Sequence, residues 1–139
     1  MSMLLAAAVA QATTSPPRFD HTADMAVVAR FLSDVRQGQA KGSEIEVMNR
    51  DNPANADFSY FQAYANECQI KRMYAIPGTS KRMPVSVEWD CGRFINVSDN
   101  PIKEVRYAGF WVKNGRVVRI VFGKIPTIPI PALNPKPIG

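Results

Sequence analysis

The chain has 139 residues, of which 46% are hydrophobic and 21% charged. This composition excludes a low-complexity, disordered body and indicates one domain with its own hydrophobic core. The net charge of +5 comes from basic residues that are spread along the sequence. Nucleic-acid-binding proteins usually gather such charge into a stripe with interleaved aromatic residues, so we expect no nucleic acid partner.

The N-terminal residues 1–17 resemble a secretory leader followed by a linker. An apolar run from Leu4 to Ala10 is followed by Gln11-Ala12, which completes a small-x-small cleavage pattern. We therefore expect an exported protein, in the bacterial periplasm or outside the cell. The alternative is a disordered or helical extension, because no Lys or Arg precedes the apolar run. No stretch reaches the roughly 20 apolar residues of a membrane-spanning helix, so we expect no membrane span.

Two amphipathic helices are expected in the first half of the chain. Apolar residues recur at three- and four-residue steps over 23–37, and this predicted helix ends at Gly38. Asp57 can cap a second helix that ends near Cys68. Between the two, residues 44–48 alternate in hydrophobicity, which is compatible with a short strand or with a further piece of helix.

Strands are expected to follow the second helix. Residues 70–76 form a predicted strand that Pro77-Gly78 interrupts. Residues 84–91 alternate cleanly, which predicts a half-buried strand. The apolar face of this strand carries Val85, Val87, Trp89 and Cys91, and the polar face carries Ser86, Glu88 and Asp90.

A β-hairpin is predicted where Asn114-Gly115 separates two strand-like runs, 105–112 and 116–122. Asn-Gly is the preferred core of a type I′ turn, which requires positive φ at both positions. The turn predicts that these pairs face each other: Val112 and Val117, Trp111 and Val118, Gly109 and Ile120, Tyr107 and Phe122. In this register Tyr107, Trp111, Val118, Ile120 and Phe122 share one face.

Both faces of the predicted hairpin are largely apolar, which indicates either a central position in the sheet or a homodimer contact through this C-terminal sheet. Gly109 in mid-strand predicts a bulge. After the domain, which we place at 18–123, residues 124–139 contain five prolines and are expected to form an extended, polyproline-like tail. That tail is either a docking segment for another chain or a loosely packed, disordered end.

The order of helices and strands predicts an α+β domain with N-terminal helices packed on a bent antiparallel sheet. The run from Tyr107 to Phe122 resembles the closing hairpin of the nuclear transport factor two-like superfamily, also called SnoaL-like or ketosteroid-isomerase-like. The resemblance spans 22–123 and is specific only toward its C-terminal end, and the helical region is shorter than is usual for that family. It implies a cone-like roll of the cystatin or SnoaL type, whose mouth forms an apolar pocket.

The resemblance implies a binding site inside that pocket. We expect five aromatic residues either to line it or to be plain core: Phe61, Tyr64, Trp89, Tyr107 and Trp111. The function hypothesis is an exported, noncatalytic domain that binds a small apolar ligand or a protein partner. The alternative is an isomerase- or hydratase-like enzyme of the SnoaL type that acts on a small apolar substrate.

No catalytic residue, metal ligand or cofactor is assigned from the sequence. His21, the one histidine, precedes the first predicted helix and is expected at the surface or as a cap. Glu88 and Asp90 can divide acid and base roles if a cleft buries them, but their spacing is more typical of a solvated strand face. Two cysteines and one histidine are too few for a zinc site.

Cys68 and Cys91 are the two cysteines of the chain. Three interpretations compete: a disulfide, a catalytic or redox thiol, and two buried reduced cysteines. Export favours the disulfide, and the spacing is not the Cys-x-x-Cys of thioredoxin-like redox sites. We therefore predict a disulfide that ties the end of the second helix to the alternating strand.

Overall fold

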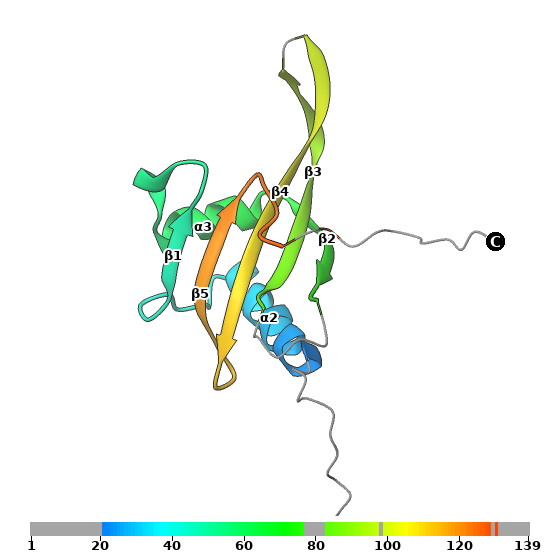
Figure 1. Ribbon diagram of the computed structural model, residues 1–139. Coiled ribbons are helices and arrows are strands. Elements are labelled where there is room, and N and C mark those ends of the chain that lie inside the picture. The colour runs from blue at the N-terminus through cyan, green and yellow to red at the C-terminus, as the bar shows by residue number, and fades with distance from the viewer. Residues whose placement is uncertain (1–20, 77–82, 98, 129, 131–139) are drawn as a thin grey trace, which may run out of the picture.

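The computed structural model describes residues 21–76, 83–97, 99–128 and 130 (Figure 1). The predicted leader, 1–17, and the C-terminal end of the predicted tail lie outside these residues. The elements in chain order are α2 (His21–Arg36), β1 (Glu46–Asn49), a 3₁₀ turn η1 (Pro53–Asn55), α3 (Phe58–Asn66), β2 (Gln69–Tyr74), β3 (Val85–Val97), β4 (Asn100–Lys113) and β5 (Arg116–Gly123).

Both predicted helices are present with the expected ends. The chain leaves α2 at Gly38, whose φ of +73° is the left-handed conformation that favours glycine at a helix C-terminus. At the start of α3, a side-chain oxygen of Asp57 accepts a hydrogen bond of 2.8 Å from the backbone N–H of Tyr60, as an N-cap does. His21 begins α2 and is buried, so the expected surface position of this residue is wrong.

The described strands form one five-stranded sheet in the order β1-β5-β4-β3-β2. The short alternating segment is therefore a strand, and β1 runs parallel to β5. The remaining neighbours pair antiparallel, so the sheet is mixed rather than antiparallel as predicted. The connection between β1 and β5 differs from a hairpin because α3 and three strands separate them along the chain. The α+β class itself is confirmed.

The predicted turn between β4 and β5 is confirmed. Asn114 has φ of +54° and Gly115 has φ of +74°, the positive values that a type I′ turn requires at both central positions. Val112 pairs with Val117, as the turn predicts. The hairpin lies inside the sheet, because β3 flanks one side of it and β1 the other.

Beyond this first pair the register differs from the prediction. Trp111 pairs with Arg119 rather than Val118, so Val118 is an extra residue that forms a bulge in β5. A shift of one residue moves the rest of a strand to the opposite face of its sheet. The face toward the helices carries Ala108, Phe110, Val112, Val117, Ile120 and Phe122. The other face carries Tyr107, Gly109, Trp111, Arg119 and Val121.

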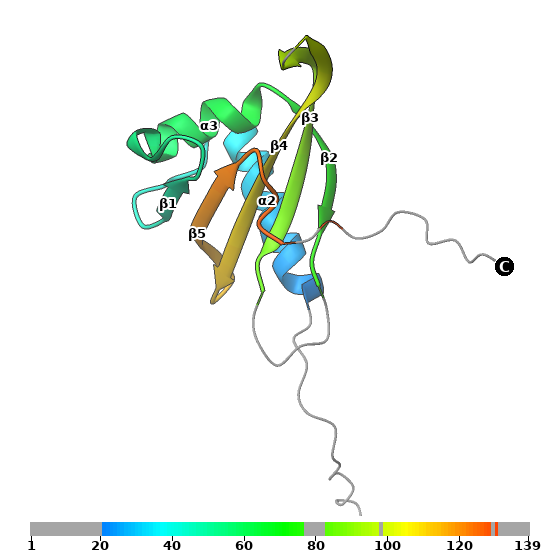
Figure 2. The same cartoon turned by 45° about the horizontal axis from the view of Figure 1, so that its top comes forward.

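The hydrophobic core lies between the sheet and the two helices, which cover the same face (Figures 1 and 2). Phe61 of α3 is at its centre. The ring centroid of Phe61 lies 5.4 Å from that of Phe122, 5.8 Å from that of Phe110 and 6.4 Å from that of Trp89, each in an edge-to-face arrangement. Aromatic side chains thus fill the space between the helices and the sheet.

After β5 the chain turns back across the face of the sheet that the helices leave open (Figures 1 and 2). We call residues 124–128 the strap. A Cβ atom on Gly109 would lie only 2.8 Å from the hydroxyl oxygen of Thr127, so the glycine allows this close approach. Gly109 therefore marks the crossing of the strap, and the bulge predicted there occurs at Val118 instead.

The β3–β4 hairpin projects beyond the rest of the sheet (Figure 1). Its register shifts between Asp90 and Phe94, where Gly92 has φ of +70°. Phe94, which is 68% exposed, and Ile102 lie on this projecting part. The sequence predicts strands over 84–91 and 105–112 and no element between them, so the projecting end of this hairpin was not predicted.

Candidate functional site

An open groove of about 440 Å³ lies between α2, the loop before β1 and the turn between β4 and β5. Its volume falls in the range of small-molecule sites, about 300 to 1,000 Å³. The apolar residues that line it are Val27, Phe31, Ile45, Val117 and Val118. The polar and charged residues that line it are Arg30, Asp34, Lys41, Ser43, Glu44 and Arg116.

The groove has an excess of positive charge, because three basic side chains and two acidic ones line it. Arg116 lies 3.6 Å from Glu44, but these side chains are 73% and 79% exposed, so solvent weakens their attraction. Arg30 and Lys41 form no ion pair with any residue that the structure describes. These two cations are therefore available to an acidic group of a ligand.

The five predicted pocket residues do not line this groove. Phe61, Tyr64 and Trp89 lie on the helix-covered side, where Tyr64 packs 6.2 Å from Trp89 between ring centroids. Tyr107 and Trp111 lie on the opposite face of the sheet, as their register positions require. Ligand binding by these five residues stays a prediction.

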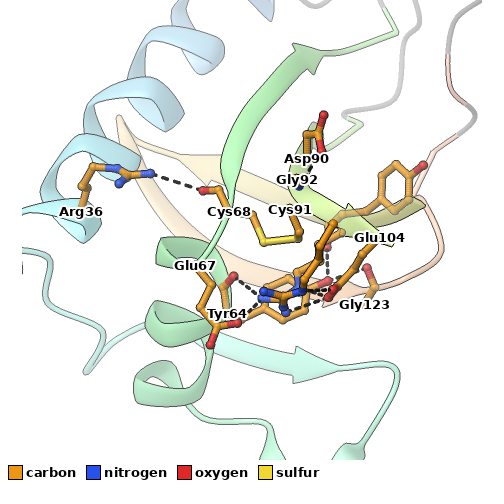
Figure 3. The surroundings of a disulfide bond; sticks show 12 residues. Arg36, Tyr64, Glu67, Cys68, Asp90, Cys91, Gly92, Glu104 and Gly123 are labelled. Carbon is orange, nitrogen blue, oxygen red and sulfur yellow. Dashed lines mark hydrogen bonds and ion pairs between the residues drawn. A yellow bond between two sulfur atoms is a disulfide. The ribbon is translucent and has the colours of Figure 1, made fainter. Parts of the chain in front are cut away.

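The predicted disulfide between Cys68 and Cys91 is present, and the two Cα atoms lie 4.3 Å apart (Figure 3). It joins the residue just before β2 to the middle of β3, as expected for a link between the end of the second helix and the alternating strand. Arg36 of α2 donates a hydrogen bond of 3.3 Å to the carbonyl oxygen of Cys68. The disulfide region thus connects both helices with the sheet.

A charge cluster with a buried centre, Arg106 and Glu104, lies beside the disulfide (Figure 3). Arg106 donates to Glu104 at 2.9 Å and to Glu67 at 2.8 Å. It also donates to the carbonyl oxygen of Tyr64, 2.9 Å away, and its guanidinium lies 4.8 Å from the centroid of the Tyr64 ring. Arg93 completes the cluster with a bond of 2.6 Å to Glu104.

These contacts hold the C-terminal end of α3 against β4. The last carbonyls of a helix lack partners within it and carry partial negative charge, so the guanidinium of Arg106 is a suitable donor for Tyr64. Burial opposes the charge of Arg106, but the hydrogen bonds that it donates to Glu67 and Glu104 outweigh this effect and raise its pKa. The hydrogen bond from Arg93 is the main cause that lowers the pKa of Glu104.

The sequence contains a signal for this cluster that our predictions did not use. Arg106 and Glu104 occupy alternate positions of β4 that lead directly into the inward-facing Ala108 and Phe110. Charged residues in phase with an apolar strand face indicate a buried ion pair. Tyr64 has a second role, because its hydroxyl donates to the carbonyl of Gly123 at 2.8 Å, and burial raises its pKa.

The polar face of β3 is not solvated as expected. Glu88 is only 4% exposed, and Ser86 beside it is buried as well. Asp90 remains accessible and lies 2.9 Å from the ammonium of Lys103. The hydrogen bond from Lys103 is the main cause that lowers the pKa of Asp90. The two carboxylates therefore have separate partners in separate surroundings.

Comparison with protein-family models, curated proteins and solved structures finds no match to this chain. Within the described residues, no helix is long and apolar enough to cross a membrane. The same residues contain no group of three or more His, Cys, Asp or Glu side chains placed to hold a metal ion. The inference of function therefore rests on the groove and on the polar face of the sheet.

Proposed function

We propose that this protein is an exported, noncatalytic domain that binds a small amphipathic anion in the groove beside α2. The observation that carries the proposal is the combination of an apolar floor with the cations of Arg30 and Lys41, which form no ion pair with the described residues. An apolar body of a ligand would cover Phe31 and Ile45, and its acidic group would lie at the basic rim.

Binding is favoured over the isomerase or hydratase alternative by the position of the groove carboxylates. Glu44 is exposed at the rim and Asp34 is half-buried, whereas general acid-base catalysis on an apolar substrate uses a carboxyl group enclosed with the reacting atoms. The aromatic core supports the same choice, since the rings of Phe61, Trp89 and Phe110 occupy the space that an internal catalytic pocket would need.

We also propose that the chain is exported and belongs to the nuclear transport factor two-like superfamily. Disulfides persist in oxidising compartments, so the Cys68–Cys91 bond supports export. Two helices on one face of a sheet that closes with an Asn-Gly hairpin support the cone-like SnoaL-type roll.

The homodimer contact through the C-terminal sheet stays a prediction, and light scattering coupled to size-exclusion chromatography tests it.

The binding proposal is tested by calorimetric titration with decanoate and with decylammonium, which have the same chain length and opposite charges. We expect decanoate to bind and decylammonium not to bind. Ser43 lies on the groove and is exposed, so Ser43→Glu should weaken decanoate binding about tenfold and Ser43→Lys should strengthen it. The control is Arg50→Gln, which removes an exposed charge that does not line the groove.

Equal binding of the two probes would contradict the proposed charge preference. Decanoate affinity that is the same in the Ser43→Glu and Ser43→Lys variants would show that decanoate binds elsewhere. Absence of decanoate binding by the unmodified protein would refute the proposal for this class of ligand.

A further inference from the structure

The second candidate site lies beneath the strap, on the sheet face opposite the helices, and shares no residue with the groove. Tyr74 of β2 pairs with Ser86 of β3, and Glu88 pairs with Tyr107 of β4, so the four residues occupy adjacent register positions. All four are buried. They are separate from the aromatic core because their strand neighbours, such as Val87, face the helices.

Three side-chain oxygens in this group are buried without a well-aligned hydrogen bond to the described residues: the Tyr74 hydroxyl, the Ser86 hydroxyl and Oε1 of Glu88. The Tyr74 and Ser86 hydroxyls are close enough to interact, and this interaction partly offsets the rise that burial causes in the pKa of Tyr74. Oε1 of Glu88 lies 2.9 Å from Nε of Arg72, which balances its charge, but the pair lacks hydrogen-bond alignment. Buried polar groups in folded proteins nearly always have partners, and leaving one without a partner is costly. Three of them on adjacent strands indicate a surface that is adapted to a polar ligand.

The strap that covers this face is weakly attached. Its described hydrogen bond runs from the backbone N–H of Lys124 to a side-chain oxygen of Asp51, 3.1 Å away. Pro126 has no N–H and cannot extend a strand ladder, and Ile125 is 63% exposed. Ile128 is the buried apolar side chain of the strap. The contact of Thr127 with Gly109 adds to this attachment, but a segment held by one described hydrogen bond and these two side chains opens locally at lower cost than a paired strand.

We propose that Tyr74, Ser86, Glu88 and Tyr107 form a saccharide-binding site that the strap covers and that opens when the strap detaches. The hydroxyl groups of a sugar would donate to Glu88 and exchange hydrogen bonds with Ser86 and Tyr74. The flat tyrosine rings would pack against the apolar face of the sugar. The carboxylate of Glu88 is paired with Arg72 at 2.9 Å, and the ammonium of Lys71, 3.6 Å away, is exposed to solvent. Among the described residues of the site, no uncompensated buried charge therefore requires a charged ligand, and a neutral ligand can bind.

The proposal predicts that loosening the strap raises apparent affinity. When only a fraction of the protein is open, the apparent affinity equals the affinity of the open form multiplied by that fraction. Ile128→Ala removes the buried side chain of the strap and should increase saccharide affinity about tenfold. Ile125→Ala is the matched control, because it makes the same type of change at an exposed strap position and should leave affinity unchanged.

The experiment uses the full chain and two probes, maltose and N,N′-diacetylchitobiose, with binding measured by calorimetry. Strap opening is measured separately by spectrophotometric titration of tyrosine. Burial raises the pKa values of Tyr74 and Tyr107, and Ile128→Ala should move both toward the ordinary value. In the Ile128→Ala background, Ser86→Ala and Glu88→Gln should each reduce affinity at least fivefold. Ser86→Ala changes little volume, so it keeps the test valid if Glu88→Gln does not fold.

The expected result is binding of at least one disaccharide that strengthens with Ile128→Ala and weakens with Ser86→Ala. Two results would overturn the proposal. In the first, the tyrosine pKa values of Ile128→Ala move toward the ordinary value but neither probe binds this variant. In the second, the affinity for the probes is the same in all variants. An unchanged tyrosine titration in Ile128→Ala would also overturn it, because the strap would then not cover this face. Decanoate binding at the groove is independent of these outcomes, so failure of one proposal does not imply failure of the other.

Discussion

Removal of the Cys68–Cys91 disulfide should cost a large part of the stability of this domain. The two cysteines are separated by 23 positions. In the chain-entropy description, closing a loop of that size lowers the entropy of the unfolded chain by about 11 cal/mol/K, or about 3.4 kcal/mol at 25 °C. Domains of this size have a total stability of about 5 to 15 kcal/mol, so the loss is substantial.

The perturbation is Cys68→Ala together with Cys91→Ala, assayed by urea unfolding and by thermal unfolding. We expect the free energy of unfolding to fall by about 3 kcal/mol and the melting temperature to fall by roughly 12 to 24 °C, at about 4 to 8 °C per kcal/mol. The dependence on urea should become steeper, since an unfolded chain without the crosslink exposes more surface. Reductant should destabilise the unmodified protein and leave the double variant unchanged.

Most of the expected effect arises in the unfolded state, which the crosslink restricts. A loss below about 1 kcal/mol with an unchanged urea slope would refute it, because the crosslink would then not restrict the unfolded chain. A smaller loss than expected that comes with a steeper slope would instead indicate that the disulfide introduces strain into the folded state. The Arg36 hydrogen bond to the Cys68 carbonyl uses the backbone and remains possible in the double variant.

Three further predictions concern packing and charge. Gly109→Val places atoms where Thr127 lies, so it should lower the free energy of unfolding in urea by about 1 to 3 kcal/mol. The Gly109→Val, Thr127→Gly double variant should recover part of this loss. Equal stability of Gly109→Val and the unmodified protein would contradict the close contact. Arg106→Gln removes the buried partner of Glu104 together with the bonds to Glu67 and to the Tyr64 carbonyl, and should cost about 3 kcal/mol. The comparison variant Arg93→Gln removes a half-exposed partner of Glu104 and should cost less than about 1 kcal/mol. The pKa of Glu104 is lowered in the folded state, so its contribution is present above the ordinary glutamate pKa of about 4.3 and is lost as the pH falls through the lower folded value. Stability should therefore fall more steeply below about pH 4 in the unmodified protein than in Glu104→Gln; parallel curves would show that Glu104 is not coupled to folding.

Local signals in the sequence were sufficient to predict the helix ends and the hairpin turn, which depend on interactions between neighbouring residues. The Asp57 cap, the glycine after α2 and the Asn114-Gly115 turn each depend on residues within a few positions of one another. The alternation of β3 similarly identified Trp89 as inward-facing. The cysteine pair predicted a long-range contact, because export and the lack of a Cys-x-x-Cys spacing left few alternatives to a disulfide.

Interactions between distant segments decided the remaining features. The bulge at Val118 has no local turn signal, and it reverses which residues of β5 face the helices. The alternation of β3 predicts that Glu88 is exposed to solvent, but Glu88 is buried because other parts of the chain cover that face. The close approach of Thr127 to Gly109 joins strands to a segment that was predicted to be a free tail.

The two candidate sites illustrate the same division. The sequence predicts that Arg30 is an ordinary surface residue of an amphipathic helix. It becomes part of a groove because α2 packs beside Ser43 and Val118. Tyr74 and Ser86 become neighbours through strand pairing. The sequence by itself determined both helices and the Asn114-Gly115 turn, because capping, turns and alternation act over a few residues, and it favoured the disulfide through the inferred export. The tertiary structure decided register, burial and the sites, because these depend on which distant surfaces meet.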